Sequence, residues 1–255
     1  MYSVIVQILS YDSSGLHSSP SRRKRSSNSR CCFSSRHVTR IRYCSEISST
    51  FSRGGGAGYT KACQQADGLL FRVGDPAAID EACQRSPVGK QRPDDLYIHR
   101  SALDALEPVL RIYEGCGRAY LGEVEGANII KIHRRSGKLS YLVYPEFEDD
   151  PHPALLRSVR VNLRTRQIDS NDYSQSANPP VLHRKETFLL PDDPRWENFA
   201  RLTAQEEKHG LLDDASGIGT REGWAKRLAE RGFTLKGHRL VKADRSPTGP
   251  VGNGL

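Results

Sequence analysis

Hydrophobic residues recur at helical spacing near the middle of the chain. The residues at this spacing are Leu110, Tyr113, Gly117 and Leu121. Intervals of three and four residues place side chains on one face of an α-helix. Pro108 suits the first turn of such a helix, where its missing N–H is not needed. The pattern therefore predicts a helix over about residues 108–120.

The segments that follow are typical of β-strands. Residues 128–134 (NIIKIHR) and 138–144 (KLSYLVY) are rich in β-branched and aromatic residues and flank Ser136-Gly137, which suits a short hairpin turn. Residues 158–168 alternate between apolar and polar, which predicts Val159, Val161 and Leu163 in the core. Residues 169–180 have the composition of a loop. Residues 181–190 (VLHRKETFLL) are predicted to form a fourth strand of a small antiparallel sheet.

The pattern becomes helical again after Pro194. One helix ending near Gly210 is predicted by Trp196, Phe199, Ala200 and Thr203. A second is predicted around Trp224 and Leu228, with Thr220 as N-cap and Gly232 as its C-terminal stop. Residues 233–242 suit a last hairpin. Helices on either side of a run of strands predict an α+β fold, formed by residues 59–243 as a single domain.

Composition separates this domain from the two ends of the chain. The first 53 residues hold 16 serines, nine lysines or arginines and only two acids. Residues 1–58 are therefore predicted to be a disordered leader, since they cannot bury enough apolar surface to fold, and residues 244–255 a disordered tail. Two origins of the leader stay open: upstream sequence attached by a wrongly assigned start, because Met1 is the only methionine, or a mitochondrial presequence.

Charge and cysteine content restrict which partners and which cellular compartment the sequence suggests. After residue 53 the chain holds 29 basic and 28 acidic residues, so +7 of the net charge of +8 belongs to the leader and does not by itself imply a nucleic-acid partner. No stretch approaches the roughly 20 apolar residues that span a bilayer. The six cysteines form no CxxC pair, which favours reduced thiols and a cytoplasmic protein.

Two local motifs suggest enzyme chemistry. Glu114, Gly115 and Gly117, in the segment YEGCGR, are similar to the glycine-rich loop of enzymes that bind S-adenosylmethionine. The alternative is a helix packed closely through Gly117. In YPEFEDDPHP, a metal for phosphodiester chemistry could be held by Glu146, Asp149, Asp150 and His152. The alternative there is an acidic turn without a metal.

Basic residues suggest a phosphate-binding surface. On the predicted strand 158–168, alternation sends Arg160, Arg164 and Arg166 outward together. The segment 178–188 (NPPVLHRKETF) presents His183, Arg184 and Lys185 in succession. If the two strands are neighbours, these side chains could bind the phosphates of a nucleic acid. The alternative is an ordinary solvated edge of the sheet.

Several motifs in the same order resemble one known family. The quoted segments lie within residues 88–242 and are GKQRPDDLYIHRSALDALEPVLRIYEGCGRAYLGEVEGANIIKIHRR, SYLVYPEFEDDPHPAL, NPPVLHRKETF, FARLTAQEEKHGLL and IGTREGW. This region is similar to part of the DNA phosphorothioation-associated methyltransferases of bacteria. Those proteins carry a cofactor loop of the type FDYGCGRG, and the present chain has no second such segment outside YEGCGRAY.

The resemblance implies a role in bacterial DNA modification. We expect an accessory, nucleic-acid-related module without its own turnover, whose partners are DNA and a separate methyltransferase or phosphorothioation proteins. The competing hypothesis is an enzyme, either a DNA methyltransferase that uses S-adenosylmethionine or, less favoured, a metal-dependent nuclease. The resemblance assigns no catalytic residue.

Overall fold

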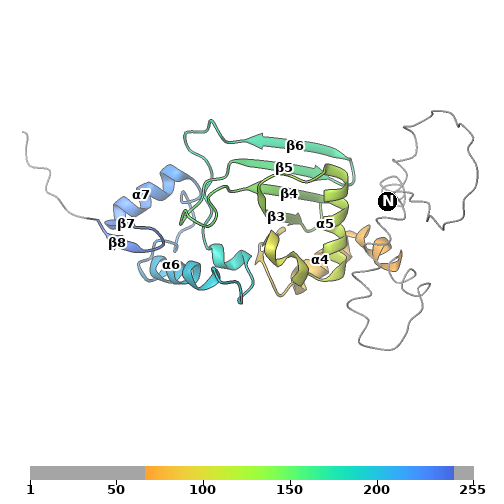
Figure 1. The fold of residues 1–255 in the computed structure, drawn as a ribbon, viewed down its shortest axis with the longest axis horizontal. Helices are drawn as coiled ribbons and strands as arrows, with labels where there is room; N and C mark the ends of the chain where they lie inside the picture. Colours follow the sequence, from red (N-terminus) through yellow and green to blue (C-terminus); the bar gives the residue numbers. More distant parts are fainter. Residues whose placement is uncertain (1–66, 244–255) are drawn as a thin grey trace, which may run out of the picture.

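A six-stranded antiparallel sheet forms the centre of the computed structural model, which describes residues 67–243 (Figure 1). The strands follow one another in sheet order as they do in sequence: β1 (Lys90–Gln91), β2 (Asp95–His99), β3 (Ala127–His133), β4 (Lys138–Val143), β5 (Arg157–Asn162) and β6 (Gln167–Asp172). The predicted α+β class is confirmed, although the sheet has six strands instead of about four. The predicted leader and tail lie outside the described residues.

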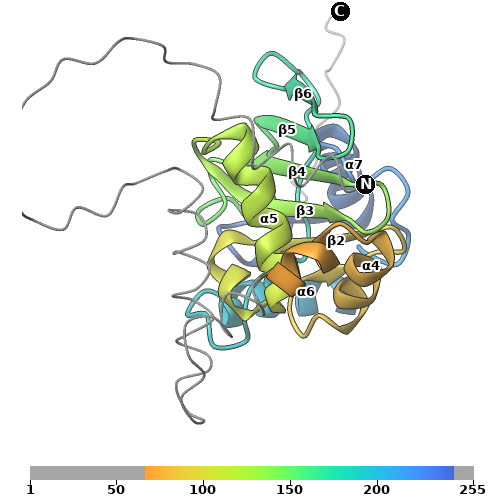
Figure 2. The same cartoon turned by 90° about the vertical axis from the view of Figure 1, so that its right-hand side faces the viewer.

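Two helices cover one face of this sheet. They are α4 (Pro76–Arg85) and α5 (Pro108–Leu121), and Figure 2 shows α5 lying across the strands. The predicted helix over residues 108–120 is thereby confirmed, with Pro108 in its first turn. The core between helices and sheet includes Ile79, Leu96, Ile98, Leu110, Ile132, Leu139 and Val161, all almost fully buried.

The other face of the sheet is covered in part by the C-terminal half of the chain. Its cover includes the 3-10 helix η3 (Lys185–Phe188) and α6 (Trp196–Lys208). A further 3-10 helix, η2 (Arg100–Ala105), follows β2 and contributes Ala102 to the core under α4 and α5. A second apolar cluster joins Ile129 and Leu142 of the sheet to Phe147, Phe188 and Phe199. Both faces therefore contribute to the core, but the α4–α5 face contributes buried apolar residues from each of the four strands β2 to β5.

The C-terminal elements match their prediction closely. α7 (Arg221–Arg231) begins after Thr220, whose hydroxyl accepts a hydrogen bond from Gly223 N, and ends at Gly232 in the left-handed conformation. β7 (Phe233–Leu235) and β8 (Leu240–Lys242) form the last hairpin. Trp224 of α7 packs with Leu211 and Ile218 in a third, smaller cluster.

Two strand predictions need correction. The supposed loop 169–180 contains most of β6, whose six residues are all exposed, so its polar composition is that of an edge strand with no apolar face. The predicted strand 181–190 is wrong: it holds an isolated bridge at Val181 and then η3. Arg184 has a φ of 57°, and this left-handed conformation breaks any extended run.

Within residues 67–243, no helix is long and apolar enough to cross a membrane. In the same range the thiols of Cys83 and Cys116 are free. The leader cysteines and Cys63 lie outside the described residues.

Candidate functional site

The segment that resembles a cofactor loop is the middle of helix α5. Glu114, Gly115 and Gly117 all lie inside its hydrogen-bonded turns. A Cβ on Gly117 would meet Leu139 Cδ1 at 2.4 Å and the hydroxyl oxygen of Tyr141 at 3.0 Å, so the glycine allows close packing of α5 on β4. Burial raises the pKa of Glu114, whose carboxylate pairs with Arg118 at 3.3 Å. The expected loop is absent, and the alternative of a closely packed helix describes this segment.

The residues expected to hold a metal point apart. Glu146 and Asp149 are exposed, and Asp150 Oδ1 accepts a hydrogen bond from His152 N at 2.9 Å. The His152 ring is buried, with Nε2 2.7 Å from Glu206 Oε1. Within residues 67–243, no group of three or more His, Cys, Asp or Glu side chains could hold a metal ion. The expected metal site is therefore not formed.

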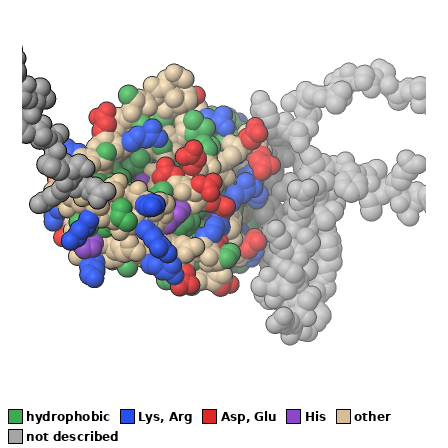
Figure 3. All heavy atoms as spheres, turned by 60° about the vertical axis from the view of Figure 1, so that its left-hand side comes forward, with side chains coloured by type: hydrophobic (Ala, Val, Ile, Leu, Met, Phe, Trp, Pro, Cys, Tyr) green, Lys and Arg blue, Asp and Glu red, His purple; other side chains and the backbone are tan. Residues whose placement is uncertain are grey.

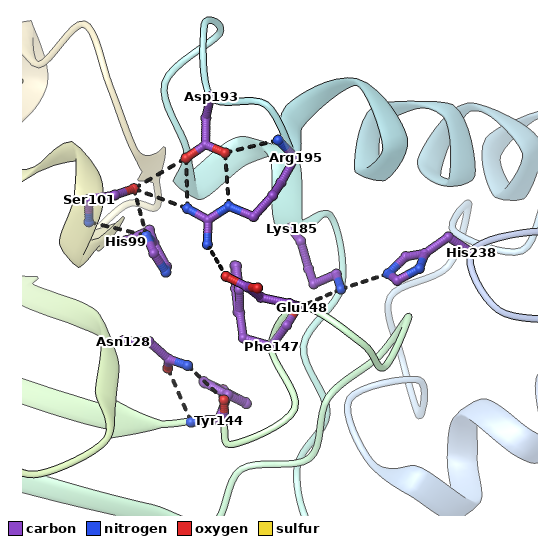
Figure 4. A network of polar contacts seen from close by, with 10 residues as sticks. All are labelled: His99, Ser101, Asn128, Tyr144, Phe147, Glu148, Lys185, Asp193, Arg195 and His238. Carbon is purple, nitrogen blue, oxygen red and sulfur yellow. Dashed lines mark hydrogen bonds and ion pairs between the residues drawn. The ribbon is translucent and has the colours of Figure 1, made fainter.

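Lys185 is directed into the protein. It is only 2% exposed, and its Nζ donates to Phe147 O at 2.8 Å and to Asp150 O at 2.7 Å. The ammonium also lies 3.8 Å from the centre of the Phe199 ring and 3.0 Å from His238 Nε2 (Figure 4). Burial lowers the pKa of Lys185 to about 7. Its contacts fix the loop between β4 and β5, so Lys185 does not belong to a phosphate-binding surface.

The two residues before Lys185 are also engaged. Arg184 forms an ion pair with Glu207. His183 Nε2 lies 2.7 Å from Ile218 O, and its ring packs against those of His152 and Trp224. Burial lowers the pKa of His183 to about 3. The segment 183–185 therefore connects α6 and α7 to the sheet instead of presenting an edge to solvent.

Near Lys185, a second polar network joins η2 to the loop before α6 (Figure 4). Arg195 binds Asp193 through Nε and Nη2, and its Nη1 is 2.7 Å from Glu148 Oε1. Ser101 N donates to His99 Nδ1 at 3.1 Å, and the His99 ring stacks on Phe147. Burial, followed by the nearby Arg195 charge, lowers the pKa of His99 to about 4. This network is an internal support for η2 and the loop before α6.

The three arginines expected on one face are divided by the end of β5. The strand stops at Asn162, whose Oδ1 accepts hydrogen bonds from Arg164 N and Thr165 N in the following turn. Arg166 adopts a φ of 61° there, and Arg164 Nη2 donates to Arg135 O at 2.9 Å. Only Arg160 remains on the strand. The prediction that Val161 and Leu163 lie in the core is confirmed, whereas Val159 is only partly buried and the grouping of Arg164 and Arg166 with Arg160 is wrong.

Arg160 belongs to a row of mostly polar side chains that crosses all six strands. The register pairs neighbouring members in the order Lys90, Tyr97, Lys131, Ser140, Arg160 and Asp169. We call these six residues the polar row. It lies on the face opposite α5, because its members alternate along the strands with the side chains packed under that helix.

The charged side chains of the polar row are at least partly exposed, and most of them are positive. Lys131 Nζ is 2.9 Å from Asp95 Oδ2 and 5.0 Å from the centre of the Tyr97 ring. Burial lowers the pKa of Lys131, but contacts with Tyr97 and Asp95 outweigh this and raise it overall. Burial is also the main cause of the lowered pKa of Lys90. Arg160 Nε is buried and has no hydrogen-bond partner within residues 67–243.

Sequence reasoning found only one member of this row, Arg160. A signal for one more member, Lys131, existed in NIIKIHR, where Lys131 and His133 alternate with the buried Ile130 and Ile132. Their neighbours on β2 and β4 could not be identified, because strand register depends on turns and bulges that the sequence pattern does not fix.

The far end of the molecule offers a contrasting surface. Figure 3 brings the α7 side forward and shows Lys and Arg side chains interspersed with Asp and Glu. A surface of mixed sign gives no net attraction for a polyanion, so the polar row is the stronger candidate site. Comparison of the chain with protein families, with curated proteins and with solved structures found no match.

Proposed function

We propose that this chain is a cytoplasmic accessory module of a bacterial DNA phosphorothioation-linked methyltransferase system, and that it contacts nucleic acid through the polar row. The setting is supported by the resemblance of residues 88–242 to proteins of that system. The contact surface is supported by the geometry of the sheet. Its partners in this proposal are DNA and a separate methyltransferase or phosphorothioation proteins.

The observation that carries the proposal is the buried Nε of Arg160, which has no hydrogen-bond partner within residues 67–243. A buried donor without an acceptor costs about 1–3 kcal/mol, and an acceptor supplied by a ligand would recover part of this cost. Arg160 Nε is such a donor, and Lys131 lies two strands away in the same row. Guanidinium and ammonium groups form charge-assisted hydrogen bonds with phosphate oxygens. Tyr97, beside Lys131, adds an aromatic ring on which a base can stack.

The enzymatic alternatives have less support. The S-adenosylmethionine hypothesis depended on a loop, whereas Glu114, Gly115 and Gly117 lie within α5. The nuclease hypothesis depended on acidic side chains gathered around His152, which is instead paired with Glu206. A binding role therefore suits the described residues better than either reaction.

The test compares two charge-removing variants of the full chain. Arg160→Gln removes the unpaired guanidinium, and Arg201→Gln removes an exposed one on α6 that pairs with Glu197. Fluorescence anisotropy with a short DNA duplex and a single strand, over a range of salt, gives the affinity and its salt slope. Because each phosphate contact releases counterions, we expect Arg160→Gln to lower the slope by about one and Arg201→Gln to leave it unchanged. Equal slopes for wild type and Arg160→Gln, or no binding at low salt, would refute the proposal.

A further inference from the structure

Ser140 of the polar row lies next to a histidine, His133, and on the other side of that histidine lies an aspartate, Asp95. Ser140 Oγ is 3.1 Å from His133 Nε2, and Asp95 Oδ1 is 2.8 Å from His133 Nδ1 on the other side of the ring. Strand register accounts for this placement. Asp95 of β2 is opposite His133 of β3, and Ser140 of β4 is opposite Lys131, two residues before His133.

We propose that Ser140, His133 and Asp95 form a hydrolytic site for carboxylic esters, with Ser140 as the nucleophile. This goes beyond the proposed function and does not depend on nucleic-acid binding. A serine hydroxyl is a weak nucleophile until a neighbouring base accepts its proton, and the base needs a third group to orient it. Here His133 is the base and Asp95 the orienting group. Nδ1–H of His133 directed at Asp95 leaves Nε2 free to accept the proton of Ser140.

The orienting contact is short but bent. Asp95 Oδ1 and His133 Nδ1 are at ion-pair distance without the alignment of a hydrogen bond. Catalytic hydrogen bonds are often poorly aligned before the substrate binds and become aligned afterwards. Asp95 itself is held by Lys131, whose Nζ is 2.9 Å from Asp95 Oδ2. A small rotation of the imidazole would therefore complete the alignment without moving the carboxylate.

Arg160 is in position to stabilise the charge that develops during the reaction. It is the partner of Ser140 across the β4–β5 ladder, and side chains opposed in this way have Cβ atoms about 4.5–5.5 Å apart. Its buried Nε has no partner within the described range, so it can donate to an oxyanion beside Ser140. Ser140 is only 1% exposed, and its ladder neighbours Lys131 and Arg160 are partly exposed. A substrate would reach Oγ only if one of these two side chains moved aside.

The reaction takes place in two balanced steps. In the first, Ser140 Oγ bonds to the ester carbonyl carbon while its proton moves to His133 Nε2. The bond from that carbon to the alcohol oxygen then breaks, and the alcohol leaves with the proton from His133. In the second, water gives a proton to His133 and bonds to the acyl carbon. The bond to Oγ breaks, the carboxylic acid leaves, and Ser140 regains its proton.

The surroundings of His133 keep its imidazole neutral. Burial, followed by the charge of Lys131, lowers the pKa of His133 to about 4. Arg160 and Lys138 act in the same direction, and Asp95 opposes them. The ring can therefore accept a proton at neutral pH. Because this pKa is depressed, reaction at Ser140 should persist as the pH falls through 6.5 and decline only near 4.

A fluorophosphonate probe tests the proposal in the full-length protein, because it phosphonylates only an activated serine. Mass spectrometry should find one labelled site, Ser140, in the native protein and none after denaturation. Ser140→Ala should lose this label, and His133→Gln should slow labelling by at least tenfold. The control is Ser158→Ala, a serine on the same face of β5 opposite Leu142, which should label at the wild-type rate.

Three outcomes would overturn the proposal: no labelling of the native protein, labelling that persists in Ser140→Ala, or an unchanged rate in His133→Gln. Circular dichroism and thermal unfolding identify variants that have lost their fold. If His133→Gln does not fold, Asp95→Asn replaces it. That variant should shift the pH dependence of labelling, which a purely structural role would leave unchanged. Labelling is measured in the absence of DNA, so this test and the test of nucleic-acid binding can fail independently.

Discussion

The two faces of the central sheet use the same strands for different purposes. Under α4 and α5, Ile132, Leu139 and Val161 are fully buried and form an unbroken apolar layer. One residue along, the same three strands place Lys131, Ser140 and Arg160 on the opposite face. The first face contributes burial free energy in proportion to its apolar area. The second includes a buried donor without a partner, which costs free energy.

This difference separates what specifies the fold from what is available for function. An apolar face is fully explained by the stability that it provides. A polar face with unpaired groups is not, because an apolar surface there would be more stable. We therefore infer that the α5 face stabilises the fold and that the polar row binds ligands. The predictions below test this division, beginning with the largest expected effect.

Truncation on the apolar face should cause the largest loss of stability. Leu139→Ala removes a side chain that is fully buried between β4 and α5. We expect the free energy of unfolding to fall by about 2–5 kcal/mol, because the substitution loses burial and leaves a cavity. Urea denaturation measures this. Val159→Ala on β5, where the side chain is only partly buried, is the control and should cost clearly less.

Buried histidines should make stability depend on pH. The pKa of His99 is lowered from 6.5 to about 4, mainly by burial, so the folded protein keeps this ring neutral while the unfolded chain takes up a proton. Stability from His99 is complete above pH 6.5 and is lost as the pH falls from 6.5 to 4, by at most about 3 kcal/mol. His133 and His183 act in the same direction.

The His99 contribution can be isolated with one variant. In His99→Asn, the amide oxygen can replace Nδ1 as acceptor for Ser101 N but does not titrate. Urea midpoints between pH 4 and 7 should therefore decline less steeply than in the wild type. His209→Asn, at an exposed position, is the control. An unchanged slope in His99→Asn would mean that His99 is not neutral in the folded protein.

The close packing of α5 on β4 should leave no room for a side chain at position 117. In Gly117→Ala the new methyl group would lie 2.4 Å from Leu139 Cδ1. Alanine is the better helix former by about 1 kcal/mol, but overpacking in a core costs about 1–3 kcal/mol, so we expect net destabilisation. Thermal unfolding measures it. Gain of stability in this variant would show that the helix can move away from the sheet without cost.

Arginines of the polar face should have the smallest effect on stability. Arg160→Gln removes a buried donor without a partner, which stabilises the fold, but it also removes packing of the arginine methylene groups. Because these effects oppose each other, the free energy of unfolding should change by less than about 1 kcal/mol. The double variant Arg164→Gln/Arg166→Gln, in the turn after β5, should leave DNA affinity closer to wild type than Arg160→Gln does. Equal losses in the two variants would mean that the turn, and not the polar row, contacts DNA.

Much of the fold could be predicted from local patterns. Helical spacing indicated α5, α6 and α7, and the caps at Thr220 and Gly232 fixed the limits of α7. The β3–β4 hairpin was indicated by its composition. The edge strand β6 was missed because its exposed residues have no apolar period. The strand β2 was missed as well. The strand predicted over residues 181–190 was wrong, because the burial of charged groups such as Lys185 depends on tertiary contacts that the local pattern does not contain.

The candidate site was much less predictable. Arg160 was singled out, but its grouping with Arg164 and Arg166 assumed that the strand continued, whereas Asn162 ends it by accepting hydrogen bonds from the turn. Lys131 and Ser140 became part of a site only through register, which pairs residues from different strands. Sequence alternation can assign a residue to a face, but only pairing shows which residues on that face are neighbours.

The most direct test of the central claim is to observe where DNA contacts the protein. Nuclear magnetic resonance of the full-length, ¹⁵N-labelled chain can follow backbone amides and the Nε–H signal of Arg160 during titration with a short DNA duplex. Our account predicts that this signal shifts together with amides of β2 to β5 around Tyr97, Lys131 and Ser140, while those of α4 and α5 remain unchanged. Shifts confined to residues 1–66 or to the α5 face, with the Arg160 signal unmoved, would contradict it.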